Sequence, residues 1–232
     1  TAVGKDALND NTTGSENTAV GANALDANTT TSQNAAFGQD ALGAATASQN
    51  AAFGAYAAAL TTTGSYNTAL GRAALYTNTT GDNNVAIGKD TLNVSTTASG
   101  NTAVGKGAMI AVTTGQYNVA VGLEALDALT TNSYNTAVGR QALSSATAGE
   151  NEAFGNRAAY GISTGTHNVC MGNHAGYNIT TGSSNTAIGR FAAGDAGGSG
   201  TNMTSDNNTL IGNVAGTQIT TGDDNTAVGA NA

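Results

Sequence analysis

Asn67-Thr68-Ala69-Leu70-Gly71 states the pattern that decides the fold: asparagine, any residue, alanine, a larger apolar residue and glycine. The asparagines that open successive copies are 17 residues apart, at Asn67, Asn84, Asn101, Asn118 and Asn135. Self-similarity at a short fixed period is typical of solenoids, in which each repeat stacks on its neighbours. The spacing therefore predicts one structural unit per repeat.

Each repeat contains two apolar patches separated by two turns. In residues 67–83, Thr68-Ala69-Leu70 is a candidate strand that Gly71 ends, and Ala73-Ala74-Leu75 is a second apolar patch. A polar segment from Asn78 to Asn83 follows, rich in the residues that form turns. Glycine and asparagine interrupt the alanine-rich pieces too often for stable helices, and no helical stripe runs through the repeat. We expect an all-β β-solenoid, a parallel β-roll or β-helix with about one coil per 17-residue repeat.

The repeats extend over 1–232 as a single array, and no shift in composition marks a domain boundary. Two intervals between opening asparagines are 16 residues, and the interval from Asn185 to Asn208 is 23 residues. The additional residues fall in a Gly- and Ser-rich run, which predicts an outward loop insertion near 194–207. Because the chain opens and closes inside a repeat, we expect a fragment of a longer fibre.

Side chains alternate along a strand, so Ala69 and Leu70 should face opposite ways. We expect the larger residue to fill the coil interior and the alanine to lie on the outer face. A flat outer row of methyl groups would suit another chain, so the pattern predicts a homotrimer through lateral packing of the Ala row. That row consists of Ala19, Ala36, Ala52, Ala69, Ala86, Ala103, Ala120, Ala137, Ala153 and Ala187.

Composition limits the partners. Charged residues make up 9% of the chain and the net charge is −8, with seven Lys and Arg residues that form no basic patch. Nucleic-acid binding is therefore disfavoured. No apolar run approaches the roughly 18 residues that span a bilayer, so we expect no membrane insertion by this segment. The single cysteine, Cys170, takes an alanine position and should be a small buried residue.

The motif resembles two families of trimeric fibres. Asn17-Thr18-Ala19-Val20-Gly21, followed by two residues and Ala24, is similar to the head repeats of trimeric autotransporter adhesins. The 17-residue version, with Thr79-Thr80-Gly81 shortly before the next opening Asn84, more closely resembles repeat arrays of phage tail fibres. The resemblance implies a trimeric β-roll in a virion fibre or on a cell surface. It carries over no catalytic residue.

A few side chains could carry chemistry. His167 and His174 occupy different repeat positions, so stacking should not pair them, although a ring of three His on a trimer axis could bind a metal. Acidic residues beside Asn in turns could hold Ca²⁺, but turn formation is the favoured interpretation. These residues are Asp82, Asp206, Asp223 and Asp224. Nucleophile–base pairs, phosphate-binding loops and believable carboxylate pairs are missing from the sequence. We therefore predict no enzyme, cofactor or metal site.

Two further residue types form rows. Paired threonines precede the turn in most repeats and could form a flat ice-binding ladder, although Thr is also a favourable strand-to-turn residue. Tyrosines near turns could stack on a host surface glycan or contact a host protein, and packing between chains is the favoured interpretation. They are Tyr56, Tyr66, Tyr76, Tyr117, Tyr134, Tyr160 and Tyr177.

Three functions are compatible with this pattern. The first is a structural fibre protein, the shaft or head of a trimeric phage tail fibre that mediates host attachment. The second is the head of a bacterial surface adhesin, and the third is an ice-binding β-solenoid. The first two place the chain in a virion or outside a cell.

Overall fold

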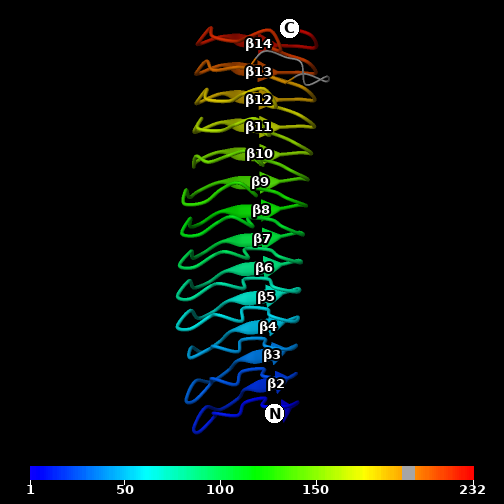
Figure 1. Cartoon of the computed structure of the whole chain (residues 1–232). Helices are drawn as coiled ribbons and strands as arrows, with labels where there is room; N and C mark the ends of the chain where they lie inside the picture. Colours follow the sequence, from blue (N-terminus) through cyan, green and yellow to red (C-terminus); the bar gives the residue numbers. More distant parts are fainter. Residues whose placement is uncertain (195–201) are drawn as a thin grey trace. The chain divides into compact units, whose positions relative to one another are not determined.

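The structure is a computed structural model that describes residues 1–194 and 202–232 (Figure 1). It contains two compact units, Thr1–Tyr117 and Asn118–Ala232, which are built from the same repeat. The described residues form strands, turns and bends, with no helix among them. The predicted all-β class is therefore confirmed.

The strands of Thr1–Tyr117 pair in parallel and in chain order. Like residues meet in the register, since Ala69 lies opposite Ala86 and Leu70 opposite Ile87. The strands are β1 Ala2–Val3, β2 Thr18–Val20, β3 Ala35–Phe37, β4 Ala51–Phe53, β5 Thr68–Leu70, β6 Val85–Ile87 and β7 Thr102–Val104. Each repeat contributes one strand, as expected of one coil per repeat.

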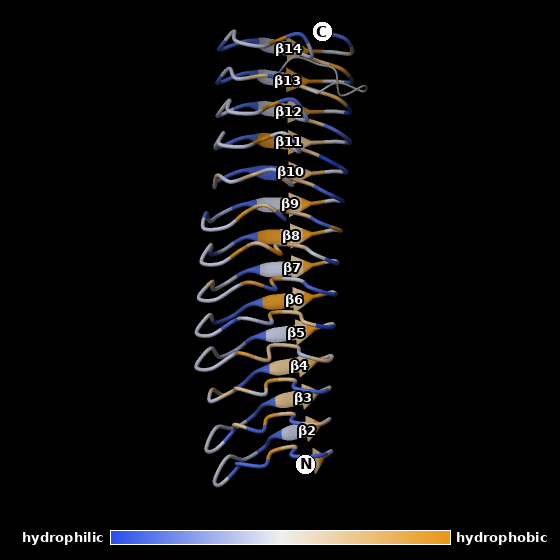
Figure 2. Ribbon diagram, viewed as in Figure 1, coloured by the Kyte–Doolittle hydropathy of each residue, from blue (hydrophilic) through white to orange (hydrophobic). Residues whose placement is uncertain are grey.

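The strands of Asn118–Ala232 follow the same rule. Ala120 lies opposite Ala137, and Val121 opposite Val138. The strands are β8 Val119–Val121, β9 Thr136–Val138, β10 Glu152–Phe154, β11 Val169–Met171, β12 Thr186–Ile188, β13 Thr209–Ile211 and β14 Thr226–Val228. Both units are β-solenoids with one coil per repeat, and Figure 2 shows apolar residues recurring at the strands from coil to coil.

The glycine that closes each strand is required by geometry. Gly71 has φ +133°, and a Cβ built on it would lie 2.5 Å from the carbonyl oxygen of Gly88 in the next coil. Any other residue would combine a disfavoured backbone conformation with a clash against backbone that cannot move aside. The recurring glycine is therefore what allows coils to approach to the spacing of a sheet.

The opening asparagine of each repeat joins successive coils. Asn67 Oδ1 accepts hydrogen bonds from the Asn84 backbone N–H (3.0 Å) and from Asn84 Nδ2 (3.1 Å). Asn67 Nδ2 in turn donates to the Gly81 carbonyl (2.8 Å) at the turn of its own coil. Both asparagines are buried, so these bonds satisfy amide groups that would otherwise be costly to remove from water. The opening asparagines therefore form a ladder of hydrogen bonds from coil to coil.

The prediction for the two faces of the strand was wrong. Ala69 is fully buried, whereas Leu70 is 48% exposed. Each alanine of the expected Ala row is likewise fully buried, and the larger residue after it is half-buried or exposed. The interior is narrow and already holds the second apolar patch, including the fully buried Leu75. Only a methyl group fits beside that leucine, so the larger residue is directed outward. The Ala row cannot pack laterally against another chain.

Two coils exchange side-chain volume between facing positions of the interior. Two coils replace the inward alanine by a larger residue, Cys170 or Leu210, and both replace the usual leucine six residues later by glycine. A Cβ on Gly176 would collide with the Cys170 sulfur, and one on Gly216 would lie 2.5 Å from Leu210 Cδ2. Since protein interiors are close-packed, a larger residue on one wall requires a smaller one opposite.

The expected loop near 194–207 lies partly outside the described residues, which omit 195–201. After this gap, Met203 is buried and forms an isolated parallel bridge with Ile179. The Thr180 backbone N–H donates to the Met203 carbonyl at 3.0 Å. Met203 therefore packs and pairs as part of a coil, and the expected loop stays a prediction.

Leu210→Ala should lower stability by about 2–5 kcal/mol, because it leaves a cavity in a closed coil. Gly216→Leu alone should also destabilise, by about 1–3 kcal/mol, through overpacking against Leu210. The double variant should recover most of the loss, since it restores the Ala and Leu arrangement of other coils. Urea unfolding midpoints of the four proteins test this, and additive losses in the double variant would contradict it.

Thr61→Val should raise the thermal midpoint by about 2–4 °C. The Thr61 hydroxyl is buried without a hydrogen-bond partner among the described residues, and Val112 occupies the same repeat position three coils on. Thr62→Val is the matched control, because Thr62 Oγ1 donates to the Thr79 carbonyl at 2.9 Å. That control should lose roughly 1 kcal/mol. A lower midpoint for Thr61→Val would show that its hydroxyl is in fact satisfied.

Candidate binding surfaces

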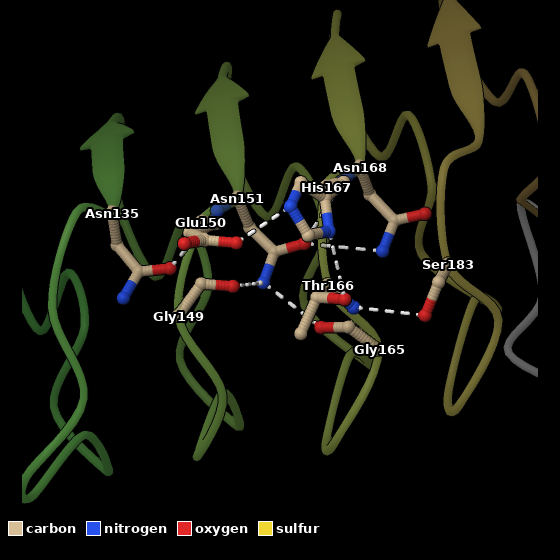
Figure 3. A network of polar contacts seen from close by, with 9 residues as sticks. All are labelled: Asn135, Gly149, Glu150, Asn151, Gly165, Thr166, His167, Asn168 and Ser183. Atoms are coloured by element: carbon tan, nitrogen blue, oxygen red, sulfur yellow. Dashed lines mark hydrogen bonds and ion pairs between the residues drawn. The ribbon is translucent and has the colours of Figure 1, made fainter.

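The turn that precedes each strand presents polar side chains beside the asparagine ladder. His167 Nε2 lies 2.6 Å from Glu150 Oε2, and the two side chains are 62% and 52% exposed (Figure 3). Both residues are the last of their repeats, so coil stacking brings them together. Asn151 lies beside the pair and bonds to the Gly149 and Gly165 carbonyls, at 3.0 and 2.9 Å. An exposed ion pair of this kind contributes little to stability.

A shallow pocket of about 350 Å³ lies next to this ion pair, with Tyr134, Glu150 and Thr166 among its lining residues. His167 Nδ1 is 3.0 Å from the Thr166 hydroxyl oxygen, and the Thr166 backbone N–H donates to Ser183 Oγ at 3.1 Å. The Glu150 carboxylate, the His167 imidazole and the Thr166 hydroxyl thus lie together at one turn, where they could form hydrogen bonds to a bound polar molecule.

A second surface is the corner that follows the closing glycine, which we call the aromatic corner. In Thr1–Tyr117 it contains Tyr56 and Tyr76, whose ring centroids are 6.4 Å apart at an interplanar angle of 82°. Arg72 Nη1 lies 3.5 Å from Asp90 Oδ1 at the same place. Two pockets of about 310 and 400 Å³ adjoin the two rings. The larger pocket is also lined by Asp26, whose carboxyl pKa is raised, mainly by burial.

The aromatic corner of Asn118–Ala232 has a different charge. Tyr160 and Tyr177 stack with centroids 5.2 Å apart, and His174 lies 5.3 Å from the rings of both Tyr177 and Phe191. Arg157 lies over the Tyr160 ring at 5.5 Å from its centroid. Desolvation by these neighbours lowers the pKa of His174, and the charges of Arg157 and Arg190 lower it further.

The two histidines do not meet, as expected from their different repeat positions. His167 is exposed, whereas His174 is half-buried among aromatic rings. Their separation follows from the coil, because His167 belongs to the turn before the strand and His174 to the aromatic corner after it. The hypothesis of a His ring on a trimer axis stays a prediction.

The turn aspartates act in the structure as hydrogen-bond acceptors between coils. Asp82 Oδ1 accepts from the Ser65 backbone N–H at 2.7 Å, and Asp206 Oδ1 accepts from that of Ser183 at 2.7 Å. Asp223 Oδ1 accepts from the Asp206 backbone N–H at 2.9 Å. Serine hydroxyls fill the same position in other coils, for example Ser99. Asp224 adopts φ 57° in the same turn, so the turn-forming interpretation is supported.

Threonines form the expected row, and the first of each pair uses its hydroxyl inside the stack. Thr62, Thr79 and Thr96 donate to the backbone carbonyl of the next coil at 2.9, 2.9 and 3.2 Å. Thr63 and Thr80, the second members of their pairs, are exposed. The hydroxyl protons of the first threonines are therefore not available to order surface water.

Cys170 is fully buried, and burial together with the charge of Glu152 raises the pKa of its thiol to about 12. It is the small interior residue that the sequence predicts, and a thiol in this state is inert. Within 1–194 and 202–232, no group of three His, Cys, Asp or Glu side chains is placed to hold a metal ion. No helix in these ranges is long and apolar enough to cross a membrane.

The most extensive surface feature is the row of large apolar residues that the strands direct outward, which we call the outward row. In Thr1–Tyr117, Phe37 and Phe53 stack with centroids 4.8 Å apart, and Leu70 is 48% exposed. In Asn118–Ala232, Phe154 and Met171 are 39% and 42% exposed. The row comprises Val3, Val20, Phe37, Phe53, Leu70, Ile87 and Val104 in the first unit, and Val121, Val138, Phe154, Met171, Ile188, Ile211 and Val228 in the second.

Sequence reasoning placed the outward row inside and did not foresee the tyrosine pairs. The available signal was repeat position: Tyr56 comes two residues after Gly54, and Tyr76 five residues after Gly71. Stacked coils bring these two positions to one corner. The exposed tyrosines Tyr66, Tyr117 and Tyr134 instead lie at the turn before the strand, where their contact with other chains stays a prediction.

Comparisons with protein-family models, curated proteins and solved structures find no match to this chain.

Acidification should destabilise the protein through His174. Its folded-state pKa is below the ordinary value of 6.5, so below that pH the unfolded chain takes up a proton that the folded protein resists. Stability should therefore be fully present above about pH 6.5 and should fall as the pH is lowered through the window beneath it. Thermal midpoints between neutral and mildly acidic pH measure the decline.

His174→Asn should flatten that decline, because asparagine tolerates the φ of 57° at this position and carries no titrating group. His167→Asn is the matched control, since His167 has a similar φ of 59° but lies at the exposed turn. The control should keep the pH dependence of the thermal midpoint that His174 contributes. An unchanged slope in His174→Asn would contradict the assignment.

Proposed function

We propose that the chain is a structural fibre protein whose copies associate side by side through the outward row. The main observation in support of this association is that each strand directs a large apolar residue away from the core, at the same register in every coil. Monomeric proteins rarely expose extended apolar patches, and such patches mark interaction surfaces. Leu70, for example, is 48% exposed although its neighbour Ala69 is fully buried.

The outward row suits a partner with the same repeat distance. Its strands stand in parallel at one register in each unit, so residues of similar size recur at regular intervals. A second copy presents the same spacing and can meet the row at many coils, whereas an unrelated surface would match it only locally. Few charges interrupt this face, and Glu152 in β10 is the only charged residue in the described strands. Self-association is therefore the favoured use, and we infer a homotrimer around one axis.

A fibre of this kind would be the shaft or head of a phage tail fibre, located in the virion, and would take part in host attachment. Two observations support this proposal. The fold consists of repeated coils, and its polar contacts mainly join one coil to the next. The alternative is the head of a bacterial surface adhesin, which uses the same architecture outside the cell. Neither function requires an enzyme active site, a cofactor or nucleic acid. The ice-binding alternative has less support, because the first threonine of each pair donates its hydroxyl to the next coil.

Sedimentation or light scattering of the full chain should give about three times the chain mass of 22.6 kDa. Replacing Phe53, Leu70, Phe154 and Met171 together by Thr should weaken association roughly tenfold or more, because apolar burial at the interface is lost. Thr keeps strand propensity, so the coils should remain folded.

Tyr66→Asn is the control, since it removes an exposed large side chain outside the outward row and asparagine tolerates the φ of 60° at this position. It should leave the mass unchanged. A wild-type chain that remains a monomer at micromolar concentration would overturn the proposal, as would a fourfold variant that associates like the wild type.

A further inference from the structure

The two pockets at the aromatic corner of Thr1–Tyr117 share Tyr56 and Tyr76. Their volumes are about 310 and 400 Å³, and each is lined by both tyrosines. Arg72, Asp90 and Asn93 line the smaller pocket, and Asp40 lines the larger. The two pockets therefore adjoin the same two aromatic rings, and we call them together the tyrosine recess.

The two rings offer apolar faces in two directions. Their planes are nearly perpendicular, at 82°, with centroids 6.4 Å apart, and both side chains are half-buried. Tyr56 is also held by its hydroxyl, which accepts a hydrogen bond from Gln39 Nε2 at 3.2 Å. Rings fixed in this way lose little conformational freedom on binding. Each ring can cover one apolar C–H face, and the two ring faces are oriented in different directions.

Hydrogen-bonding groups surround the rings. Arg72 lies 3.5 Å from Asp90, so the guanidinium and the carboxylate are held together at the rim. Asn93 Nδ2 donates to the Ala73 carbonyl at 3.0 Å, which leaves its Oδ1 as an acceptor. Asp40 Oδ1 accepts from Asn23 Nδ2 at 2.8 Å, and its second oxygen remains available. The rim is thus rich in acceptors, which match a ligand that carries many hydroxyl donors.

Charge excludes most anions from this recess. Asp26, Asp40 and Asp90 line it, against the cations Arg72 and Lys89, and both cations pair with Asp90. A carboxylate or phosphate on the ligand would face the two remaining aspartates. A neutral polyhydroxylated ring meets no such repulsion.

We propose that this recess binds a neutral saccharide, which stacks on Tyr56 and Tyr76 and donates hydroxyls to Asp40, Asp90 and Asn93. The proposal deepens the attachment role given above, because it names the ligand class that a fibre surface would recognise. The corresponding corner of the second unit is lined by Arg157 and His174 instead, so the proposed selectivity for a neutral ligand is specific to the first.

Saturation-transfer NMR on the full chain tests the site, with cellotriose, chitotriose and mannotriose at millimolar concentration as probes. At least one of these neutral trisaccharides should receive saturation from the protein. Tyr56→Ala and Tyr76→Ala should each weaken that binding roughly tenfold, as expected for a central aromatic contact. Tyr66→Ala is the matched control, because Tyr66 is exposed in the same unit at another corner, and it should bind like the wild type. Circular dichroism establishes that each variant is folded.

A sialylated trisaccharide gives the charge comparison and should bind more weakly than the best neutral probe. Asp90→Asn should leave the fold intact and also reduce affinity, because the rim loses a charged acceptor. Three outcomes would each overturn the proposal: no saturation of any neutral probe, binding of the acidic probe alone, or equal losses in Tyr56→Ala and Tyr66→Ala. The mass measurement is independent, so a monomer that binds saccharide would reject self-association while keeping this site.

Discussion

Every coil of this protein depends on one buried amide. The opening asparagine accepts from the backbone and side chain of the next asparagine and donates to the turn of its own coil, as Asn67 does toward Asn84 and Gly81. An unpaired amide in the same place would cost several kcal/mol, so removing one side chain leaves two coils with unsatisfied groups. The ladder thus couples neighbouring repeats through hydrogen bonds that run along the stack.

The sequence was sufficient for the architecture because asparagine and glycine act through the backbone. Their spacing predicted a parallel β-solenoid with one coil per repeat, without any knowledge of packing. It did not reveal which face of the strand points inward. Alternation distinguishes two faces, but the choice between them depends on how much room the second apolar patch leaves. Leu75 fills that room, so Ala69 is inside and Leu70 outside.

The candidate sites were predictable only in part, for a related reason. Single residues such as His167 and Asp82 could be assigned to turns from their repeat positions. The tyrosine recess could not, because Tyr56 and Tyr76 occupy different positions in different repeats and meet only when coils stack. Such pairings also set the charge of each aromatic corner. The corner that contains Arg72 is acidic, and the corner that contains Arg157 is basic. The proposed saccharide site thus depends on residues that depart from the repeat pattern.

The exchange of volume between Leu210 and Gly216 has a consequence for how such arrays change in length. The packing adjustment lies within one coil, and each coil presents the same hydrogen-bonding groups of its opening asparagine to the next coil. Gain or loss of a whole 17-residue coil therefore preserves both packing and pairing, whereas a cut through the middle of a coil disturbs both. Insertion or deletion of whole repeats in the gene can therefore change the length of the protein without compensating substitutions in the remaining coils.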